Sequence, residues 1–178
     1  MRLQPHPDFV PAGVQDVTVR ASRSNAALVL HFRCQCDAGA IRLPPKAGAV
    51  RTDGLWQGTC CEAFLREPGR NGYLEFNFSP SGQWAAYAFD TYRSGMRPLD
   101  LPTPRLAFQT DATGFELSAD IEIPGEWSRD WICALTAVLL DREGRASYWS
   151  LQHAPGKPDF HHSTGFVLDL PAPVATGR

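Results

Sequence analysis

Alternation of hydrophobic and polar residues dominates this chain and predicts β-strands rather than helices. The segment 115–123 alternates strictly, with apolar residues at every second position and Glu, Ser or Asp between them. The segment 26–34 follows the same two-residue period, whereas 132–140 is almost continuously apolar. A two-residue period is typical of a strand with one buried face, and a continuous apolar run indicates a strand buried on both faces.

The same reasoning over the whole chain predicts about ten short strands, separated by turns rich in Gly, Pro, Ser and Asn. We place them at 14–21, 26–34, 60–67, 73–79, 83–92, 105–110, 115–123, 132–140, 146–153 and 165–170. A tight turn is expected at 124–127, and no long amphipathic helix or internal repeat interrupts the series. The predicted fold class is all-β, an antiparallel β-sandwich of jelly-roll type. We expect a single domain over 1–178, in which 171–178 form a loose tail.

Composition and charge argue against some classes of partner and do not change the predicted fold class. The 178 residues include 15 Gly and 15 Pro, and the formal net charge is −2 without any run of Lys or Arg. This balance argues against nucleic acid and anionic membranes as partners. The N-terminus lacks the apolar core of a secretory signal, and five cysteines show no zinc-ligand spacing. We therefore expect a cytoplasmic protein with buried, reduced thiols and no metal site.

One group of polar and aromatic residues is a candidate binding surface. In 73–79 the residues Leu74, Phe76 and Phe78 share one face and are expected in the core, so Glu75 and Asn77 point the other way. Glu62 and Trp56 come shortly before this strand, and Tyr87 and Arg93 come after it. Aromatic faces beside a few hydrogen-bonding groups suit a flat, polar ligand such as a sugar ring. The alternative is an ordinary solvated sheet face.

The second half of the chain adds further candidates. The polar loop 153–162 is long enough to reach over a sheet edge, and Trp149 before it is either a second aromatic for the ligand or a core residue. The predicted ligand-binding residues are Trp56, Glu62, Glu75, Asn77, Tyr87, Arg93, Trp149, His153, Lys157 and His161.

Four motifs in order give the chain a recognisable resemblance. They are LWQGTCCEAFL at 55–65, YLEFNFSPSGQW at 73–84, FELSADIEIP at 115–124 and FHHSTGFVLDL at 160–170. The chain resembles the DOMON-like superfamily, near the family-nine carbohydrate-binding modules and their small stand-alone bacterial relatives. The resemblance covers about residues 14–170. It implies a β-sandwich with one concave ligand face, on which sugar-binding members clamp the ring between aromatic residues and other members hold haem.

These observations predict a protein that binds a small ligand, a saccharide or sugar derivative, without catalysis or a cofactor. The first alternative is a haem b protein with Met96 and His153 as axial ligands, or with His161 or His162 in place of His153. The second is a small enzyme that uses Glu62 and Glu75, or a histidine of 153–162, as acid and base. The third is a protein-interaction domain. The chain has no Gly-rich phosphate loop and no G-x-S-x-G motif.

Overall fold

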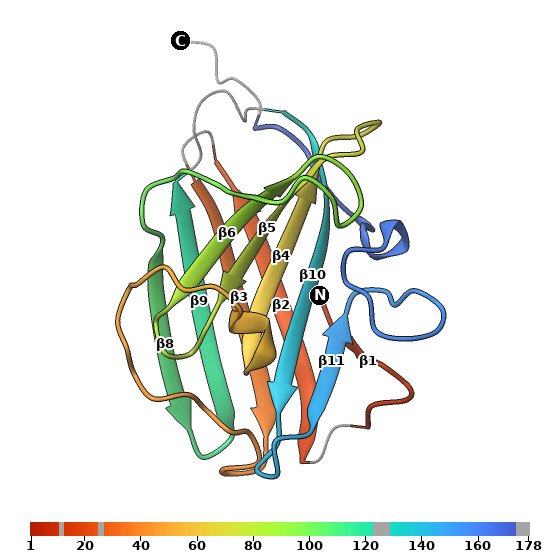
Figure 1. Ribbon diagram of the computed structural model, residues 1–178. Coiled ribbons are helices and arrows are strands. Elements are labelled where there is room, and N and C mark those ends of the chain that lie inside the picture. Colours follow the sequence, from red (N-terminus) through yellow and green to blue (C-terminus); the bar gives the residue numbers. More distant parts are fainter. Residues whose placement is uncertain (11–12, 25–26, 123–128, 174–178) are drawn as a thin grey trace.

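The structure, a computed structural model, describes residues 1–10, 13–24, 27–122 and 129–173 and consists of strands with two short 3-10 helices in these ranges (Figure 1). Their order is β1 (Gln4–Pro5), β2 (Val14–Arg23), β3 (Ala27–Cys36), η1 (Leu55–Gln57), β4 (Cys60–Arg66), β5 (Tyr73–Phe78), β6 (Trp84–Phe89), β7 (Arg97–Pro98), β8 (Arg105–Asp111), β9 (Gly114–Glu122), β10 (Trp131–Leu140), β11 (Ala146–Ser150), η3 (Ser163–Gly165) and β12 (Leu168–Leu170). Within these ranges no helix has the length and apolar character that crossing a bilayer requires.

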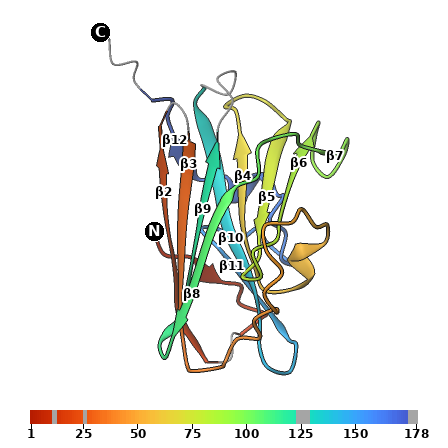
Figure 2. The same ribbon diagram turned by 90° about the vertical axis from the view of Figure 1, so that its left-hand side faces the viewer.

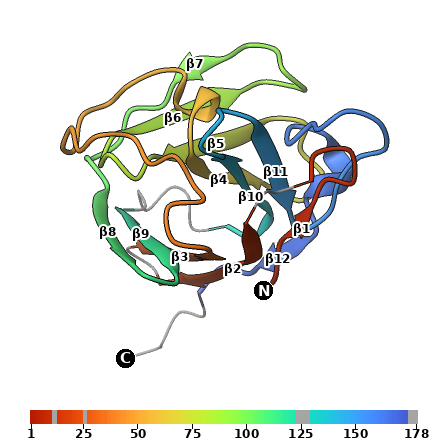
Figure 3. The same cartoon turned by 90° about the horizontal axis from the view of Figure 1, so that it is seen from below.

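The strands form two antiparallel sheets that face each other, as Figure 3 shows from below. The larger sheet has the order β1-β11-β10-β4-β5-β6-β7, and the smaller one has the order β2-β3-β9-β8. β10 is long enough to pair twice along one edge, with β12 through 131–133 and with β11 through 136–140. The predicted antiparallel β-sandwich is confirmed.

The main core lies between the sheets and follows from the alternation in the sequence. Phe32 of β3 and Leu117 of β9 point inward from the small sheet, and Phe76 and Phe78 of β5 point inward from the large one. All four side chains are fully buried. The expectation that Phe76 and Phe78 belong to the core is therefore confirmed, and it fixes the opposite face of β5 as the outward one.

The outward face of the large sheet is also covered, by loops and by η1. A second apolar cluster forms there around Phe64, Tyr73, Phe89 and Phe166. η1 lies on this side, away from the small sheet (Figure 2). β4 is consequently buried on both faces along almost its whole length, although it contains a glutamate. A sheet face covered by loops can bury polar side chains that an ordinary solvated face would leave in water.

Each predicted strand has a counterpart, with differences at the ends. The strand expected at 146–153 stops at Ser150, and the one expected at 165–170 shrinks to β12 because 163–165 form η3, whose first turn is capped by His162. Two short strands were not predicted, β1 and β7. The expected turn at 124–127 and most of the expected tail lie outside the described residues. All five cysteines are buried and unpaired.

Candidate functional site

A cleft of about 940 Å³ opens on the loop-covered face of the large sheet. β4, β5, β6 and β10 contribute residues to its floor, and loops around η1, after β6 and after β11 form its walls. Most of the predicted binding residues line it: Trp56, Glu62, Glu75, Tyr87, Arg93, Lys157 and His161. Because these seven residues come from three strands and three loop regions and meet in one cleft, they indicate one binding site.

Two buried carboxyl groups lie at the floor of the cleft. Glu62 on β4 and Glu75 on β5 are only 2% and 5% exposed, and they come from paired neighbouring strands. Burial raises the pKa of Glu62 well above its ordinary value, and the nearby Glu75 carboxylate raises it further. Burial likewise raises the pKa of Glu75, opposed by a hydrogen bond from Asn77 and by the charge of Arg93. The pair therefore holds protons more tightly than carboxyls in water.

Among the described residues, Glu62 and Glu75 each accept one side-chain hydrogen bond. Asn77 Nδ2 donates to Glu75 Oε1 at 2.7 Å, and Thr136 Oγ1 donates to Glu62 Oε2 at 3.3 Å. Glu62 Oε1 is buried without a hydrogen-bond partner in the described residues. Asn77 itself does not line the cleft but lies beneath it and orients Glu75. An unsatisfied buried carboxyl oxygen is costly, and it is the kind of group that a ligand donor can satisfy.

His161 lies between the loop after β11 and the floor. Its Nδ1 is 2.7 Å from the Tyr73 hydroxyl, which accepts a hydrogen bond from the backbone N–H of Arg93 at 3.2 Å. Its Nε2 is 3.8 Å from Glu75 Oε2. This arrangement favours the tautomer in which Tyr73 donates to Nδ1 and the ring proton sits on Nε2. Burial, assisted by the positive charge of Arg93, lowers the pKa of His161 to about 4, so the ring is neutral at neutral pH.

An ion pair and a hydrogen bond connect the loop after β6 to the loop after β11. Arg93 Nη2 contacts Asp159 Oδ1 at 2.9 Å, and the Tyr92 hydroxyl donates to Asp159 Oδ2 at 2.6 Å. These contacts hold the pKa of Asp159 below its usual range, although burial opposes them. Arg93 also has a backbone φ of 52°, a left-handed conformation that a non-glycine residue adopts only when its surroundings enforce it. One wall of the cleft is thus fixed by Arg93 and Asp159.

The mouth of the cleft carries exposed apolar and charged groups. Trp56 on η1 is 55% exposed and Met96 is 61% exposed, although both line the cleft. Asp53, in the loop before η1, accepts a hydrogen bond from the Tyr87 hydroxyl at 2.6 Å. Lys157 is exposed at the edge. A large aromatic ring left in solvent beside buried polar groups is a feature of sugar-binding surfaces.

Trp149 does not belong to the cleft, which corrects the suggestion that it forms a second aromatic platform. It is 3% exposed, packs in the core between the sheets and donates from Nε1 to Ser147 Oγ at 3.0 Å. Because successive strand residues point to opposite faces, its neighbour Tyr148 lines the cleft instead. Tyr148 packs edge-on against Phe9 and Phe160, which also line the cleft and were not predicted from the sequence.

The histidines proposed as haem ligands are engaged by protein groups. His153 lies outside the cleft, with Nε2 2.8 Å from the carbonyl oxygen of Gln4, so it does not share a pocket with Met96. His162 caps η3 and its Nδ1 is 2.9 Å from Thr164 Oγ1. His161 does line the cleft, but its two ring nitrogens face Tyr73 and Glu75. Within the described ranges no three His, Cys, Asp or Glu residues are grouped to hold a metal ion.

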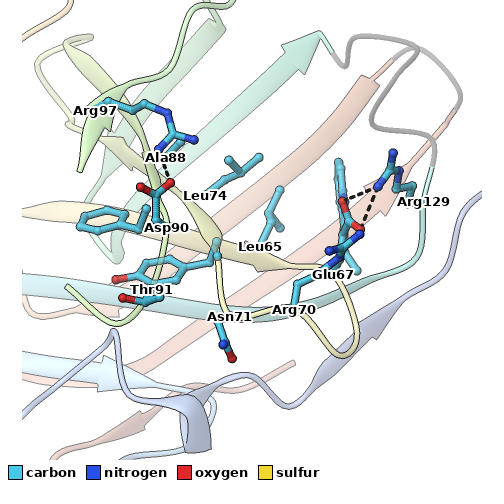
Figure 4. A pocket seen from close by; sticks show the side chains of 14 residues that line it. Leu65, Glu67, Arg70, Asn71, Leu74, Ala88, Asp90, Thr91, Arg97 and Arg129 are labelled. Atoms are coloured by element: carbon cyan, nitrogen blue, oxygen red, sulfur yellow. Dashed lines mark hydrogen bonds and ion pairs between the residues drawn. The ribbon is translucent and has the colours of Figure 1, made fainter. Parts of the chain in front are cut away.

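A second hollow lies at one end of the large sheet, beside Leu65 and Leu74 (Figure 4). Its charged groups are paired with each other: Arg129 binds both oxygens of Glu67 at 3.0 and 3.1 Å, and Arg97 binds Asp90 at 2.5 Å. In contrast to the cleft, it presents charges that are already neutralised. We therefore take the cleft over β4, β5, β6 and β10 as the candidate functional site.

The chain resembles known proteins in structure and matches none of those compared in sequence. No protein-family profile matches the chain, and no curated protein matches it in sequence. Among solved structures, it is similar to a candidate carbohydrate-binding protein from Bacteroides uniformis ATCC 8492, with 13% identity, a TM-score of 0.65, and coverage of 93% of this chain and 84% of that one.

It is also similar to a family 9 carbohydrate-binding module from Caldicellulosiruptor kristjanssonii in complex with cellotriose, with 10% identity, a TM-score of 0.58, and coverage of 96% and 83% of the two chains. A structure of a family 9 module from the same organism in complex with glucose has 10% identity, a TM-score of 0.50, and coverage of 86% and 76%. The expected resemblance to family-nine modules is therefore confirmed at the level of the fold.

Proposed function

We propose that this protein binds a saccharide in the cleft over the large sheet and does not transform it. The observation that carries the proposal is the combination of the exposed Trp56 ring with the buried Glu62 and Glu75 carboxyls in one cleft. The similarity in fold to modules found with cellotriose and glucose supports the same class of ligand.

In this proposal, the aromatic ring and the polar groups of the cleft contact different parts of the sugar. Trp56 offers a flat apolar face to the C–H face of a sugar, worth about 0.5–1.5 kcal/mol beyond the area that it buries. Glu62, Glu75 and the Tyr87–Asp53 pair offer hydrogen-bonding atoms to sugar hydroxyls. The cleft volume of about 940 Å³ falls in the range of small-molecule sites, roughly 300–1,000 Å³.

The test is calorimetric titration of the purified protein with cellotriose. We expect measurable binding that is lost or weakened about tenfold in Trp56→Ala, and largely kept in Trp56→Phe, which retains an aromatic face. Because Trp56 is exposed, neither substitution should lower the thermal midpoint of unfolding. Full affinity in a folded Trp56→Ala protein would show that the ring plays no part in binding.

A second candidate function is general acid–base catalysis on the bound sugar. The observation that favours it is that both carboxyls face one cleft and both have raised pKa values, as a proton-donating acid requires. Chromatography of cellotriose after prolonged incubation separates the two functions. Intact cellotriose supports binding alone, whereas products that disappear in the double variant Glu62→Gln/Glu75→Gln would identify an enzyme.

A further inference from the structure

The floor of the cleft is acidic and incompletely satisfied. Glu62 lines the cleft, and its Oε1 is buried without a partner among the described residues, while Glu62 Oε2 has only the long contact from Thr136. In the described part of the chain, Glu75 Oε2 accepts no hydrogen bond, and His161 Nε2 lies 3.8 Å from it. Glu62 and Glu75, from adjacent strands, thus both line the cleft, and each has one carboxyl oxygen that accepts no hydrogen bond from the described residues.

The cations around the cleft neutralise this floor only in part. The charge of Arg93 acts on Glu75, but its Nη2 is paired with Asp159 at the wall. Lys157 is exposed at the edge of the cleft. His161 is the group nearest to Glu75, and its lowered pKa keeps it uncharged at neutral pH. The remaining neighbour, Asp53, adds negative charge at the mouth.

We propose that the saccharide taken by this cleft carries a primary amine, which binds as an ammonium group between Glu62 and Glu75. The inference rests on the proposed saccharide-binding function and specifies its ligand class. An ammonium group has three donors and no acceptor, so it can satisfy Glu62 Oε1 and Glu75 Oε2 together. A hydroxyl has one donor proton and brings no charge, so it leaves one of these oxygens unsatisfied.

The raised pKa of Glu62 agrees with the binding of an ammonium group between the two carboxyls. Burial and repulsion from Glu75 raise the pKa of Glu62, so the free protein holds this proton more tightly than an ordinary carboxyl does. A bound cation favours the ionised form, because opposite charges within a few ångströms lower the pKa of a carboxyl. Hydrogen bonds between charged groups are about twice as strong as neutral ones and are strengthened further where water is excluded.

The test compares three trisaccharides that differ at one position of each ring. They are cellotriose, the β-1,4-linked trimer of glucosamine, and the β-1,4-linked trimer of N-acetylglucosamine, all titrated into the whole protein in slightly acidic buffer so that the free amine is protonated. We expect the glucosamine trimer to bind about tenfold or more tightly than cellotriose. Acetylation removes the charge and should remove this advantage.

Two variants assign the effect to the floor of the cleft. Glu62→Gln keeps the size of the side chain and should bring the affinity for the glucosamine trimer down to that for cellotriose. Glu67→Gln is the matched control, because Glu67 binds Arg129 away from the cleft and should leave the ratio unchanged. Equal or weaker binding of the glucosamine trimer, with cellotriose still bound, would overturn the amine preference and leave the saccharide function standing. Failure of all three sugars to bind would overturn both.

Discussion

The Tyr73 hydroxyl and His161 Nδ1 lie 2.7 Å apart and connect the large sheet to the loop that covers it. Tyr73 is held in place by stacking on Phe89, with ring centroids 4.7 Å apart and planes 8° from parallel. The same hydroxyl accepts the backbone N–H of Arg93. One oxygen atom therefore joins β5, the loop after β6 and the loop after β11, and it positions His161 next to Glu75.

Replacing Tyr73 by Phe should destabilise the protein without disturbing the ring stack. The substitution leaves His161 Nδ1 and the Arg93 N–H without a partner, and an unsatisfied buried polar group costs about 1–3 kcal/mol. We expect that loss in the free energy of unfolding measured in urea. Tyr92→Phe is the control, because its exposed hydroxyl contacts Asp159 and should contribute less than about 0.5 kcal/mol. Equal losses in the two variants would contradict the role of Tyr73.

His161 should make the protein less stable as the pH falls. Its folded pKa of about 4 lies below the ordinary value of 6.5, so the unfolded chain binds the proton more readily. The stability that neutral His161 contributes is complete above about pH 6.5 and is lost as the pH falls towards about 4. The full loss is of the order of 3 kcal/mol.

Urea unfolding measured between neutral pH and about pH 4 tests this dependence. His161→Gln cannot take up the proton, so its stability should fall less steeply than that of the wild type over the same window. A parallel decline in wild type and His161→Gln would show that other groups control the acid sensitivity.

Arg51 provides a separate test of how the β6–β7 edge is held. Its Nη1 donates to the carbonyl oxygen of Leu99 at 2.8 Å, and its Nη2 donates to that of Ala86. A lysine ammonium lacks the planar fork that reaches both acceptors, so Arg51→Lys should lower the free energy of unfolding by about 1–3 kcal/mol. Arg97→Lys changes an exposed pair with Asp90 and an exposed hydrogen bond to the carbonyl oxygen of Gly95, and it should cost less than about 0.5 kcal/mol. A thermal-shift comparison of the two variants decides between these outcomes.

The fold was predictable because its strongest signals are local. Strict alternation in 115–123 places alternate side chains inside and outside, and the structure has β9 there with that burial pattern. The two-residue strands β1 and β7 were missed since both contain proline and neither has enough residues to show a period. Their position depends on pairing with β11 and β6, which no local pattern encodes.

The site was predictable only where strand alternation determined it. Once Phe76 and Phe78 faced the core, Glu75 and Asn77 had to face the opposite side, and the register of β4 pairs Glu62 with Asn77 on that face. For β11 the period was correct but the face was not, because both Tyr148 and Trp149 are plausible core residues. The pairing of loop residues, such as Arg93 with Asp159, requires the three-dimensional path of two loops and leaves no periodic trace in the sequence.

Glu62→Gln should stabilise the free protein, because the wild-type carboxyl is buried without adequate partners. A folded pKa raised above the ordinary value of 4.5 means that the native state binds the proton more tightly than the unfolded chain, so stability declines as the pH rises through the folded pKa. Glutamine does not titrate, and we expect a gain of about 0.5–2 kcal/mol at neutral pH that shrinks towards pH 4.5. Urea unfolding at several pH values measures this gain. Such a gain, combined with weaker binding of an amine-bearing sugar, would show that Glu62 contributes to ligand binding and lowers stability. A pH-independent loss of stability would show instead that Glu62 stabilises the fold.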